Sequence, residues 1–335
     1  MARIYHDGDA DLGVLRSRRV GSIGFGNQGR AQSLNLRDSG VPIRIGNIDD
    51  EYRERAIEDG FDVVSIPEIA EQSDVLLMLI PDEVQPEVYE RDVAPHLKPG
   101  DALCFASGYN IFYRCIAPSE EVDTILVAPR MIGRAVRSLY EQQEGYPCLV
   151  GVENDASGDA LRIALAIARG IGATRLGAFH SSFREEALID LFAEQMLWAG
   201  INRLGLTYFE KLVEHGCDPE IVATELHLSG EFLEIARAMI TEGFFNQLRL
   251  HSHTSQYGQL SRGDRMVPPA LQEEIAQIMG EIESGAFAKE WAQEQADELP
   301  TLRKLWEQAV EHPLSHAEAR LEALRQVVAK AHLGD

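Results

Sequence analysis

The chain has 335 residues, of which 45% are hydrophobic and 25% are charged, a composition typical of soluble globular proteins. This length predicts about two domains and a core large enough to need neither a disulfide nor a structural metal. The 31 Lys and Arg residues are outnumbered by 54 Asp and Glu residues, so the formal net charge is −23. A surface this negative repels phosphate backbones and anionic lipid, and we therefore expect no general binding of nucleic acid or membranes.

No segment predicts a membrane span or a secretion signal. The longest apolar run, VLLMLI at residues 75–80, is far shorter than the roughly 20 residues that a membrane helix requires. The N-terminal segment carries acids and lacks the apolar core of a signal peptide. Four cysteines are scattered without metal-binding spacing, and we expect reduced, mostly buried thiols in a cytoplasmic protein: Cys104, Cys115, Cys148 and Cys217.

The first half of the chain alternates short apolar runs with amphipathic stretches. Strands are predicted over residues 20–23, 42–45, 74–80, 102–106, 124–128 and 148–151, with helices over 28–39 and 53–59. This alternation predicts a parallel sheet with right-handed crossovers.

After about residue 180 the apolar residues recur at helical spacing only. Helices are predicted over residues 183–214, 219–241, 269–284, 287–298 and 315–331. We therefore predict an α/β Rossmann domain over residues 1–181, followed by an all-α domain over residues 182–330.

A glycine-rich motif, GFGNQG, directly follows the first predicted strand and opens the first helix. In this context Gly24 permits the tight turn, Gly26 lets the backbone approach a pyrophosphate, and Gly29 lets helix and strand pack closely. The helix N-terminus offers unpaired N–H groups to the phosphates. The motif predicts a dinucleotide site, although a glycine turn without a ligand is the alternative.

The choice of nicotinamide cofactor depends on charge at the end of the second predicted strand. Asp49 lies about 20 residues beyond the glycines, where a carboxylate accepts from a ribose 2′-hydroxyl and repels a 2′-phosphate. Arg44 and Arg53 flank this loop and are able to serve a phosphate instead. NADH is therefore the favoured cofactor, and NADPH stays open.

Two acids in the helical half, Asp190 and Glu194, are four residues apart and are expected to share one helix face. Two carboxylates presented together suit Mg²⁺, which prefers oxygen ligands. Acids at this spacing are also common on solvated surfaces, so the pair alone does not decide between the two interpretations.

Several segments together make the chain resemble the ketol-acid reductoisomerase family over nearly its whole length. The segments that carry the resemblance are DADLG (9–13), GFGNQGRAQSLNLRDSG (24–40), PDEVQPEVYE (81–90), HLKPGDAL (96–103), SGYNI (107–111), VAPR (127–130), DASG (155–158), FREEALIDLFAEQ (183–195), HTSQYG (253–258) and SGAFAKEW (284–291).

The resemblance implies a Rossmann domain followed by a helical, knotted and dimeric domain of the class I type, and a homodimer or higher oligomer. It also implies an NAD(P)H enzyme with two Mg²⁺ ions that migrates an alkyl group in a 2-acetohydroxy acid and then reduces the ketone. Asp190 and Glu194 match metal ligands of the family, and Ser252 matches a substrate-binding serine. The positions that match cofactor contacts are Phe25, Gly26, Asn27, Gln28, Asp82, Glu83, Val84, Gln85 and Gly133.

The chain departs from the family at positions that the resemblance places in the reaction site. Ser107 stands where the family has a histidine, and Arg130 stands where it has a lysine. On the second metal-binding helix Glu225 matches the first glutamate, but Ser229 replaces the second. Glu231 replaces that carboxylate only if the helix shifts locally, because a six-residue spacing places it on another face.

These departures weaken the expectation of alkyl migration more than that of hydride transfer, since migration needs two divalent ions to polarise adjacent oxygens. Our leading hypothesis is an NAD(P)H-dependent reductase of a small polar ketone or imine, in specialised biosynthesis. Asp190, Glu194 and Glu225 would hold substrate directly or through one Mg²⁺, while Arg130 and Ser252 position its anionic end.

Two alternatives stay open at this point. One is a true Mg²⁺-dependent reductoisomerase of branched-chain amino-acid synthesis that acts on 2-acetolactate. The other is a dinucleotide-binding sensor that kept the fold and lost turnover.

Overall fold

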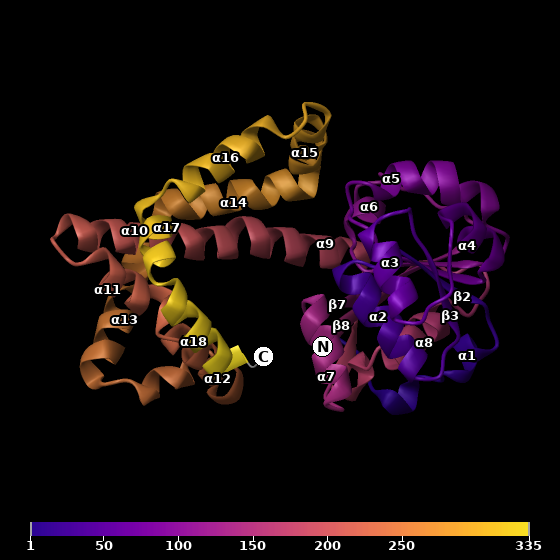
Figure 1. Cartoon of the computed structure of the whole chain (residues 1–335), viewed down its shortest axis with the longest axis horizontal. Helices are drawn as coiled ribbons and strands as arrows, with labels where there is room; N and C mark the ends of the chain where they lie inside the picture. Colours follow the sequence, from indigo (N-terminus) through magenta and orange to yellow (C-terminus); the bar gives the residue numbers. More distant parts are fainter. Residues whose placement is uncertain (1, 334–335) are drawn as a thin grey trace. The chain divides into compact units, whose positions relative to one another are not determined.

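The computed structural model describes residues 2–333, and the chain divides into two compact units, one ending at Asp190 and the other beginning at Leu191. Figure 1 shows the chain coloured along its sequence, with most of its helices and some of its strands labelled. Among the described helices, none combines the length and apolar character that crossing a bilayer requires.

The first unit is built on a nine-stranded sheet with the order β1-β9-β8-β7-β6-β5-β2-β3-β4. Its strands are β1 (Ile4–Tyr5), β2 (Val20–Ile23), β3 (Ile43–Gly46), β4 (Val63–Val64), β5 (Val75–Met78), β6 (Ala102–Phe105), β7 (Asp123–Pro129), β8 (Pro147–Asn154) and β9 (Gly177–His180). The six neighbouring strands β4, β3, β2, β5, β6 and β7 are all parallel, which confirms the Rossmann-type fold predicted from the sequence.

The prediction of a wholly parallel sheet was wrong for the side of the sheet beyond β7. Strand β8 runs antiparallel to β7, and the edge strand β1 runs antiparallel to β9. The connection from β7 to β8 does not cross the sheet, because its helix packs mainly against helix α2 and the chain then returns to the same end of the sheet.

Helices of the first unit connect and cover these strands. They are α1 (Gly13–Arg16), α2 (Asn27–Asp38), α3 (Glu51–Glu58), α4 (Ile66–Gln72), α5 (Gln85–Val88), α6 (Tyr109–Phe112), α7 (Gly133–Glu141), α8 (Ala160–Gly170) and the start of α9 (Phe183–Phe192). The strands β1 and β4 were not predicted, since two residues carry too little periodicity to detect, and the four-residue strand β9 was also missed.

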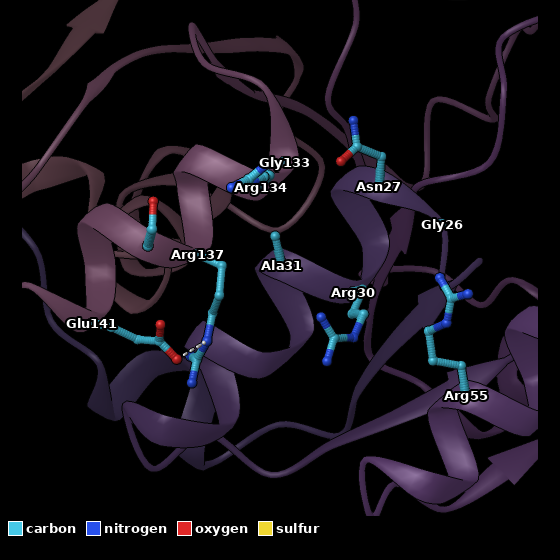
Figure 2. Close-up of a pocket in the computed structure, with 10 residues that line it drawn as sticks. Gly26, Asn27, Arg30, Ala31, Arg55, Gly133, Arg134, Arg137 and Glu141 are labelled. Atoms are coloured by element: carbon cyan, nitrogen blue, oxygen red, sulfur yellow. Dashed lines mark ion pairs between the residues drawn. The ribbon is translucent and has the colours of Figure 1, made fainter. Parts of the chain in front are cut away.

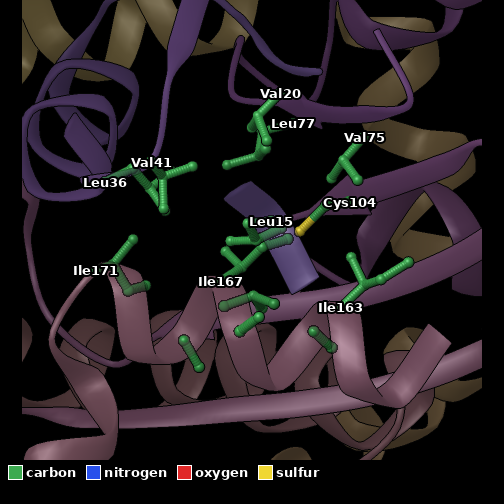
Figure 3. Packing of buried hydrophobic residues seen from close by; sticks show 14 of the residues in the cluster. Leu15, Val20, Leu36, Val41, Val75, Leu77, Cys104, Ile163, Ile167 and Ile171 are labelled. Atoms are coloured by element: carbon green, nitrogen blue, oxygen red, sulfur yellow. The ribbon is translucent and has the colours of Figure 1, made fainter. Parts of the chain in front are cut away.

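The sheet is buried on both faces, as parallel strands require. Alternate residues of one strand enter different cores: Val75 and Leu77 of β5 join one cluster, while Leu76 and Met78 join the other. Figure 3 shows the first cluster, in which isoleucines spaced by four residues along α8 pack toward the strands. These two cores hold the carboxyl ends of the strands in fixed positions.

The second unit is helical over its described residues, as predicted. After the π-helical segment η5 (Ala193–Trp198), its elements are α10 (Ala199–Glu214), α11 (Pro219–Ala223), the π-helical segment η6 (Thr224–Leu228), α12 (Glu231–Glu242), α13 (His253–Met266), α14 (Pro269–Ser284), α15 (Ala286–Ala296), α16 (Pro300–Val310), α17 (Pro313–Arg320) and α18 (Glu322–Leu333). Two predicted helices are each divided, at Ser229–Gly230 and at Leu321, and α13 and α16 were missed.

The cysteines differ in part from the expectation. All four are free thiols, and Cys104 and Cys148 are buried in the sheet, but Cys115 and Cys217 are exposed. The prediction of mostly buried thiols therefore fails for two of the four, because these two lie outside the strands, beyond the ends of helices α6 and α10.

Candidate functional site

The glycine turn has the geometry that a dinucleotide-binding turn needs. Gly24 adopts a φ of 94°, and a Cβ there would lie 2.8 Å from the backbone oxygen of Leu79. A Cβ on Gly29 would lie 2.3 Å from the backbone oxygen of Gly24, so the close approach of helix and strand depends on glycine. Gly26, in contrast, faces open space, which leaves room for a ligand to approach its backbone.

A cavity of about 740 Å³ begins at this turn and runs along the carboxyl ends of β2 and β5. This is the place where open α/β sheets bind their ligands. The cavity is lined by the turn residues Gly24 to Gln28, by Asp50 and Tyr52 at the start of α3, and by Asp82, Gln85 and Ser107 beyond β5 and β6. The residues present therefore fit a bound nicotinamide dinucleotide.

The acid of the loop before α3 that lines this cavity is Asp50, which we did not predict. Asp50 is the N-cap of α3 and accepts from the backbone N–H groups of Tyr52 and Arg53, both at 3.0 Å. Asp49, the predicted ribose partner, is exposed and lines a neighbouring cavity of about 550 Å³ instead. The adjacent Asp–Asp pair in the sequence signals an acid here but not which of the two faces the groove.

The two arginines that flank this loop are already engaged. Arg53 donates to the backbone oxygens of Val63 and Val64, at 3.3 and 3.4 Å. Arg44 pairs with Asp62 at 2.6 Å. Both guanidinium groups therefore have partners already. An arginine that is to receive a 2′-phosphate would be expected to have free donors.

Several predicted cofactor residues hold the rim of the groove through their side chains. Gln85 is buried and donates to the backbone oxygen of Ile80 and to Asp82, and Gln28 donates to the backbone oxygen of Met131. Glu83 and Val84 are exposed, and only Val84 lines the cavity.

Gly133, another predicted cofactor residue, lies where α7 meets the glycine turn. A Cβ there would come within 2.1 Å of the backbone oxygen of Asn27, so the residue lets the start of α7 approach the turn.

Asp82 and Ser107 form a hydrogen-bonded pair inside the groove. The Ser107 hydroxyl donates to Asp82 Oδ2 at 2.9 Å and accepts from the Tyr109 N–H at 3.3 Å. Burial raises the pKa of Asp82 to about 6, and the negative charges of Glu83 and Asp190 act in the same direction, against the hydrogen bond from Ser107. The groove therefore contains a hydroxyl group that is hydrogen-bonded to a carboxyl group with a pKa of about 6.

Arg130 joins two acids of α9 to the end of β7. Its guanidinium donates to Glu186 Oε1 at 2.8 Å and to Asp190 Oδ1 at 2.5 Å. Glu186 has only 2% of its side chain exposed, and its second oxygen accepts from the Gly108 N–H at 2.5 Å. Burial and, to a smaller extent, the charge of Asp190 raise the pKa of Glu186 to about 7, against the lowering effects of the Gly108 N–H and of Arg130.

Glu186 was missed by the sequence analysis, although a signal was present. The segment FREEALID places Glu186 four residues before Asp190, the same spacing that led us to pair Asp190 with Glu194. The structure brings Glu186 and Asp190 together on Arg130. The pattern alone does not tell which of two successive i, i+4 pairs meets a cation.

Glu194 and Glu225 both lie in π-helical segments of the second unit and are exposed. Such segments often occur at functional sites. Gly230 takes a left-handed conformation with φ of 82° and separates η6 from α12, so Glu231 begins a new helix rather than continuing the one that carries Glu225.

Ser252 has a local structural task. It is the N-cap of α13, and its hydroxyl accepts from the Ser255 N–H at 3.3 Å.

Within residues 2–330, no three His, Cys, Asp or Glu side chains are grouped so as to hold a metal ion. Asp190 is engaged by Arg130, which supplies positive charge where the family resemblance implies a divalent ion. Mg²⁺ binding by Asp190, Glu194 and Glu225 stays a prediction.

A parallel sheet with a glycine turn, a groove at the strand ends and titratable groups beyond it defines a nicotinamide-dinucleotide-dependent oxidoreductase. Comparison with known families agrees. Residues 14–177 match the NADPH-binding domain of acetohydroxy acid isomeroreductase, and residues 183–327 match the C-terminal domain of ketol-acid reductoisomerase.

Individual relatives cover almost the entire chain. It is 41% identical to a ketol-acid reductoisomerase (NADP(+)) of Saccharopolyspora erythraea, with 96% of this chain and 97% of the relative covered. It is 42% identical to the enzyme of that name from Pyrobaculum calidifontis, over 97% of this chain and 99% of the relative.

One solved structure, an NADH-preferring ketol-acid reductoisomerase from an uncultured archean, matches with a TM-score of 0.91 at 36% identity. The match covers 96% of this chain and 99% of that structure. The chain belongs to the ketol-acid reductoisomerase family.

Proposed function

We propose that the protein is an NADH-dependent reductase that transfers a hydride to a small polar ketone or imine. The observation that carries the proposal is the pair formed by Ser107 and Asp82, which lines the dinucleotide groove where the family has a histidine. Reduction of a carbonyl needs an oriented nicotinamide and one acid, and this pair supplies the acid.

The proton takes a short path in this proposal. NADH, when bound, would supply the hydride that the substrate's carbonyl carbon takes up. When Asp82 is protonated, the 2.9 Å hydrogen bond runs the other way, from the carboxyl group to Ser107 Oγ, and the Ser107 hydroxyl proton is free to face the substrate. Ser107 then donates that proton to the carbonyl oxygen as negative charge develops there, and the Asp82 carboxyl replaces it across the same hydrogen bond. The products are an alcohol and an Asp82 carboxylate, which regains its proton from solvent before the next turnover.

Arg130 positions the substrate's anionic end rather than donating a proton. A guanidinium stays protonated under all physiological conditions, so general-acid chemistry is closed to it. Its bonds to Glu186 and Asp190 use Nη1 and Nη2, and the Nε–H group is the donor that this proposal gives to the substrate's carboxylate. Glu194, Glu225 and Ser252 stay predicted substrate residues on the family resemblance alone, and the Ser252 hydroxyl also caps α13.

NADH is the cofactor we expect. Asp50 lines the groove at this loop, and Arg44 and Arg53, which flank the loop in the sequence, are held by other partners. A 2′-phosphate placed at this loop would therefore meet the Asp50 carboxylate and two arginines that are already engaged. We expect kcat/KM to be at least tenfold higher with NADH than with NADPH, and an NADPH preference above tenfold would contradict the assignment.

Alkyl migration is the weaker half of the family's activity in this chain. Mg²⁺, when bound, would polarise adjacent substrate oxygens, and that step needs two ions held by several carboxylates. Ser229 offers no carboxylate, and Arg130 already neutralises Asp190.

The decisive experiment compares two substrates with the purified protein, NADH and Mg²⁺, by following absorbance at 340 nm. A 3-hydroxy-2-ketoacid requires reduction alone, whereas 2-acetolactate requires migration first. We expect oxidation of NADH with the former and at least a hundredfold lower kcat/KM with the latter. Comparable rates on both substrates would favour a true reductoisomerase, the alternative that the relatives' names support.

A dinucleotide-binding sensor is the remaining alternative. It would bind NADH without turnover on any member of a carbonyl and imine panel.

A further inference from the structure

A second cavity, of about 350 Å³, lies between helices α2, α3 and α7 of the first unit. Figure 2 shows four arginines around it: Arg30 from α2, Arg55 from α3, and Arg134 and Arg137 from α7. A cluster of four guanidinium groups stands out in a chain whose formal net charge is −23. The cavity touches the glycine turn at Gly26 and Asn27 but is lined otherwise by different residues from the dinucleotide groove.

Two of these arginines are held by acids. Arg30 pairs with Asp59 at 2.6 Å, and Arg137 pairs with Glu141 at 2.8 Å and with Asp38 at 2.7 Å. Their positions are therefore fixed, and their charges are partly neutralised.

The other two arginines, Arg55 and Arg134, have no acidic partner among the described residues. Within residues 2–333, no carboxylate pairs with Arg55 or with Arg134, and both side chains are exposed; Arg55 lies over the Tyr52 ring, 5.5 Å from its centroid. Two charges without counterions, beside two oriented guanidinium groups, leave the cavity with an excess of positive charge.

Two helix N-termini add to this field. Helix α2 begins at Asn27 and α7 begins at Gly133, and neither has a side-chain cap, so the N–H groups of their first turns are free of capping side chains. The two helix starts meet because Gly133 has no side chain; a Cβ there would lie 2.1 Å from the Asn27 backbone oxygen. The positive end of α7 thus lies beside these arginines, while that of α2, which the glycine turn offers to the dinucleotide, lies at the border of the two cavities.

We propose that this arginine cavity binds the phosphate group of a phosphate-bearing small molecule, at a site distinct from the groove that holds the dinucleotide. Guanidinium groups bind phosphate through paired N–H donors, and Arg55 and Arg134 have those donors available. The volume suits a mono- or diphosphate group with a small attached moiety. The phosphate could come from a separate metabolite or from the 2′-phosphate of NADPH, and the experiment distinguishes these sources.

The test uses inorganic pyrophosphate as the probe and isothermal titration calorimetry of the full-length protein. We expect Arg134→Gln and Arg55→Gln each to weaken pyrophosphate binding at least threefold, and the double variant at least tenfold. Arg162→Gln is the matched control, since Arg162 is an exposed arginine on α8 whose partner is Asp159, and we expect its affinity within twofold of the original protein. Thermal unfolding of each variant checks that it folds.

Competition with the two cofactors identifies the source of the phosphate. If saturating NADH and NADPH both leave pyrophosphate binding within threefold, the site serves a separate phosphate-bearing metabolite. If NADPH alone competes, and the double variant loses affinity for NADPH but not for NADH, the site receives the cofactor's 2′-phosphate, and the NADH preference proposed above falls.

Three outcomes would overturn the proposal. They are no binding of pyrophosphate by the original protein, an unchanged affinity in the double variant, and complete displacement by NADH, which would place the pyrophosphate in the dinucleotide groove. None of these measurements needs turnover, so the arginine cavity is tested independently of the proposed reductase activity.

Discussion

The proposed proton path makes a sharp prediction for Asp82→Asn. Asparagine keeps the size of the side chain and still accepts from the Ser107 hydroxyl, but it cannot replace the proton that Ser107 gives away. Because the folded-state pKa of Asp82 is raised to about 6, the group is protonated below that pH and loses its proton above it. The rate of the original protein should therefore fall as pH rises.

The size of the effect follows from the position of this pKa. General acids contribute about 10²- to 10⁴-fold to a rate, so Asp82→Asn should lower kcat about 100-fold at pH 6. With a pKa near 6, only about a tenth of the carboxyl groups carry a proton at pH 7, which predicts a tenfold fall in kcat/KM per pH unit above neutrality. The variant should lose this slope.

The assay follows NADH oxidation with a 3-hydroxy-2-ketoacid between pH 5.5 and 8.5. Other titratable groups near Asp82 are Glu83, Glu186, Asp190, Tyr109 and Cys115, so the slope must be compared between the two proteins rather than assigned from one profile. Glu90→Gln removes an exposed carboxylate from the segment that follows α5 and serves as the control for charge. It should keep the original profile.

Two results would refute the reasoning. One is an Asp82→Asn variant that retains kcat within threefold of the original protein. The other is a variant that loses activity but keeps the fall above pH 6, because that would place the titrating acid elsewhere. An unchanged KM for NADH would show that the variant still forms the groove.

Three further predictions concern the cation site, the metal and the assembly. Arg130→Met should lower the free energy of unfolding, measured by urea denaturation, by about 2–3 kcal/mol, because it leaves buried Glu186 without its cation. The raised pKa of Glu186 lets this carboxyl group take up a proton at low pH, so the loss of stability should be larger at pH 8 than at pH 5. Equal losses at the two pH values would contradict this account. Chelation of Mg²⁺ with EDTA should leave reduction of the hydroxyketoacid within about twofold while abolishing any conversion of 2-acetolactate; loss of both activities would require a metal in hydride transfer. Light scattering should find a dimer or larger assembly, because the second unit exposes large apolar side chains. A monomer at micromolar concentration would contradict this prediction. The exposed side chains include Ile221, Phe232, Ile240, Phe244, Phe245, Leu250 and Tyr257.

The sequence predicted the parallel part of the sheet because its strands are buried on both faces and read as continuous apolar runs, such as residues 75–78. It did not predict the reversal at β8, which depends on where α7 packs rather than on the strand's own residues. Likewise, the break at Gly230 is visible as a glycine, but only the φ of 82° shows that one helix ends and another begins there.

The candidate site was predictable where a local motif fixes it and was not where distant segments meet. The glycine turn follows from the order of residues 24–29 and their place after a strand. The contact of Arg130 with Glu186 joins residues 56 positions apart, and the choice of Asp50 over Asp49 depends on which carboxylate caps α3. Neither appears in any short pattern, because both are set by packing between elements.

Gly108 connects the two parts of the site through the main chain. A Cβ on this residue would lie 2.2 Å from the Phe183 backbone oxygen, and its N–H is held by Glu186. The loop of Ser107 and helix α9 are thus joined through Gly108 and Glu186, without the side chain of Ser107. The residue at position 107 is therefore able to change without breaking this link, whereas position 130 must keep a cation beside the buried Glu186 carboxylate.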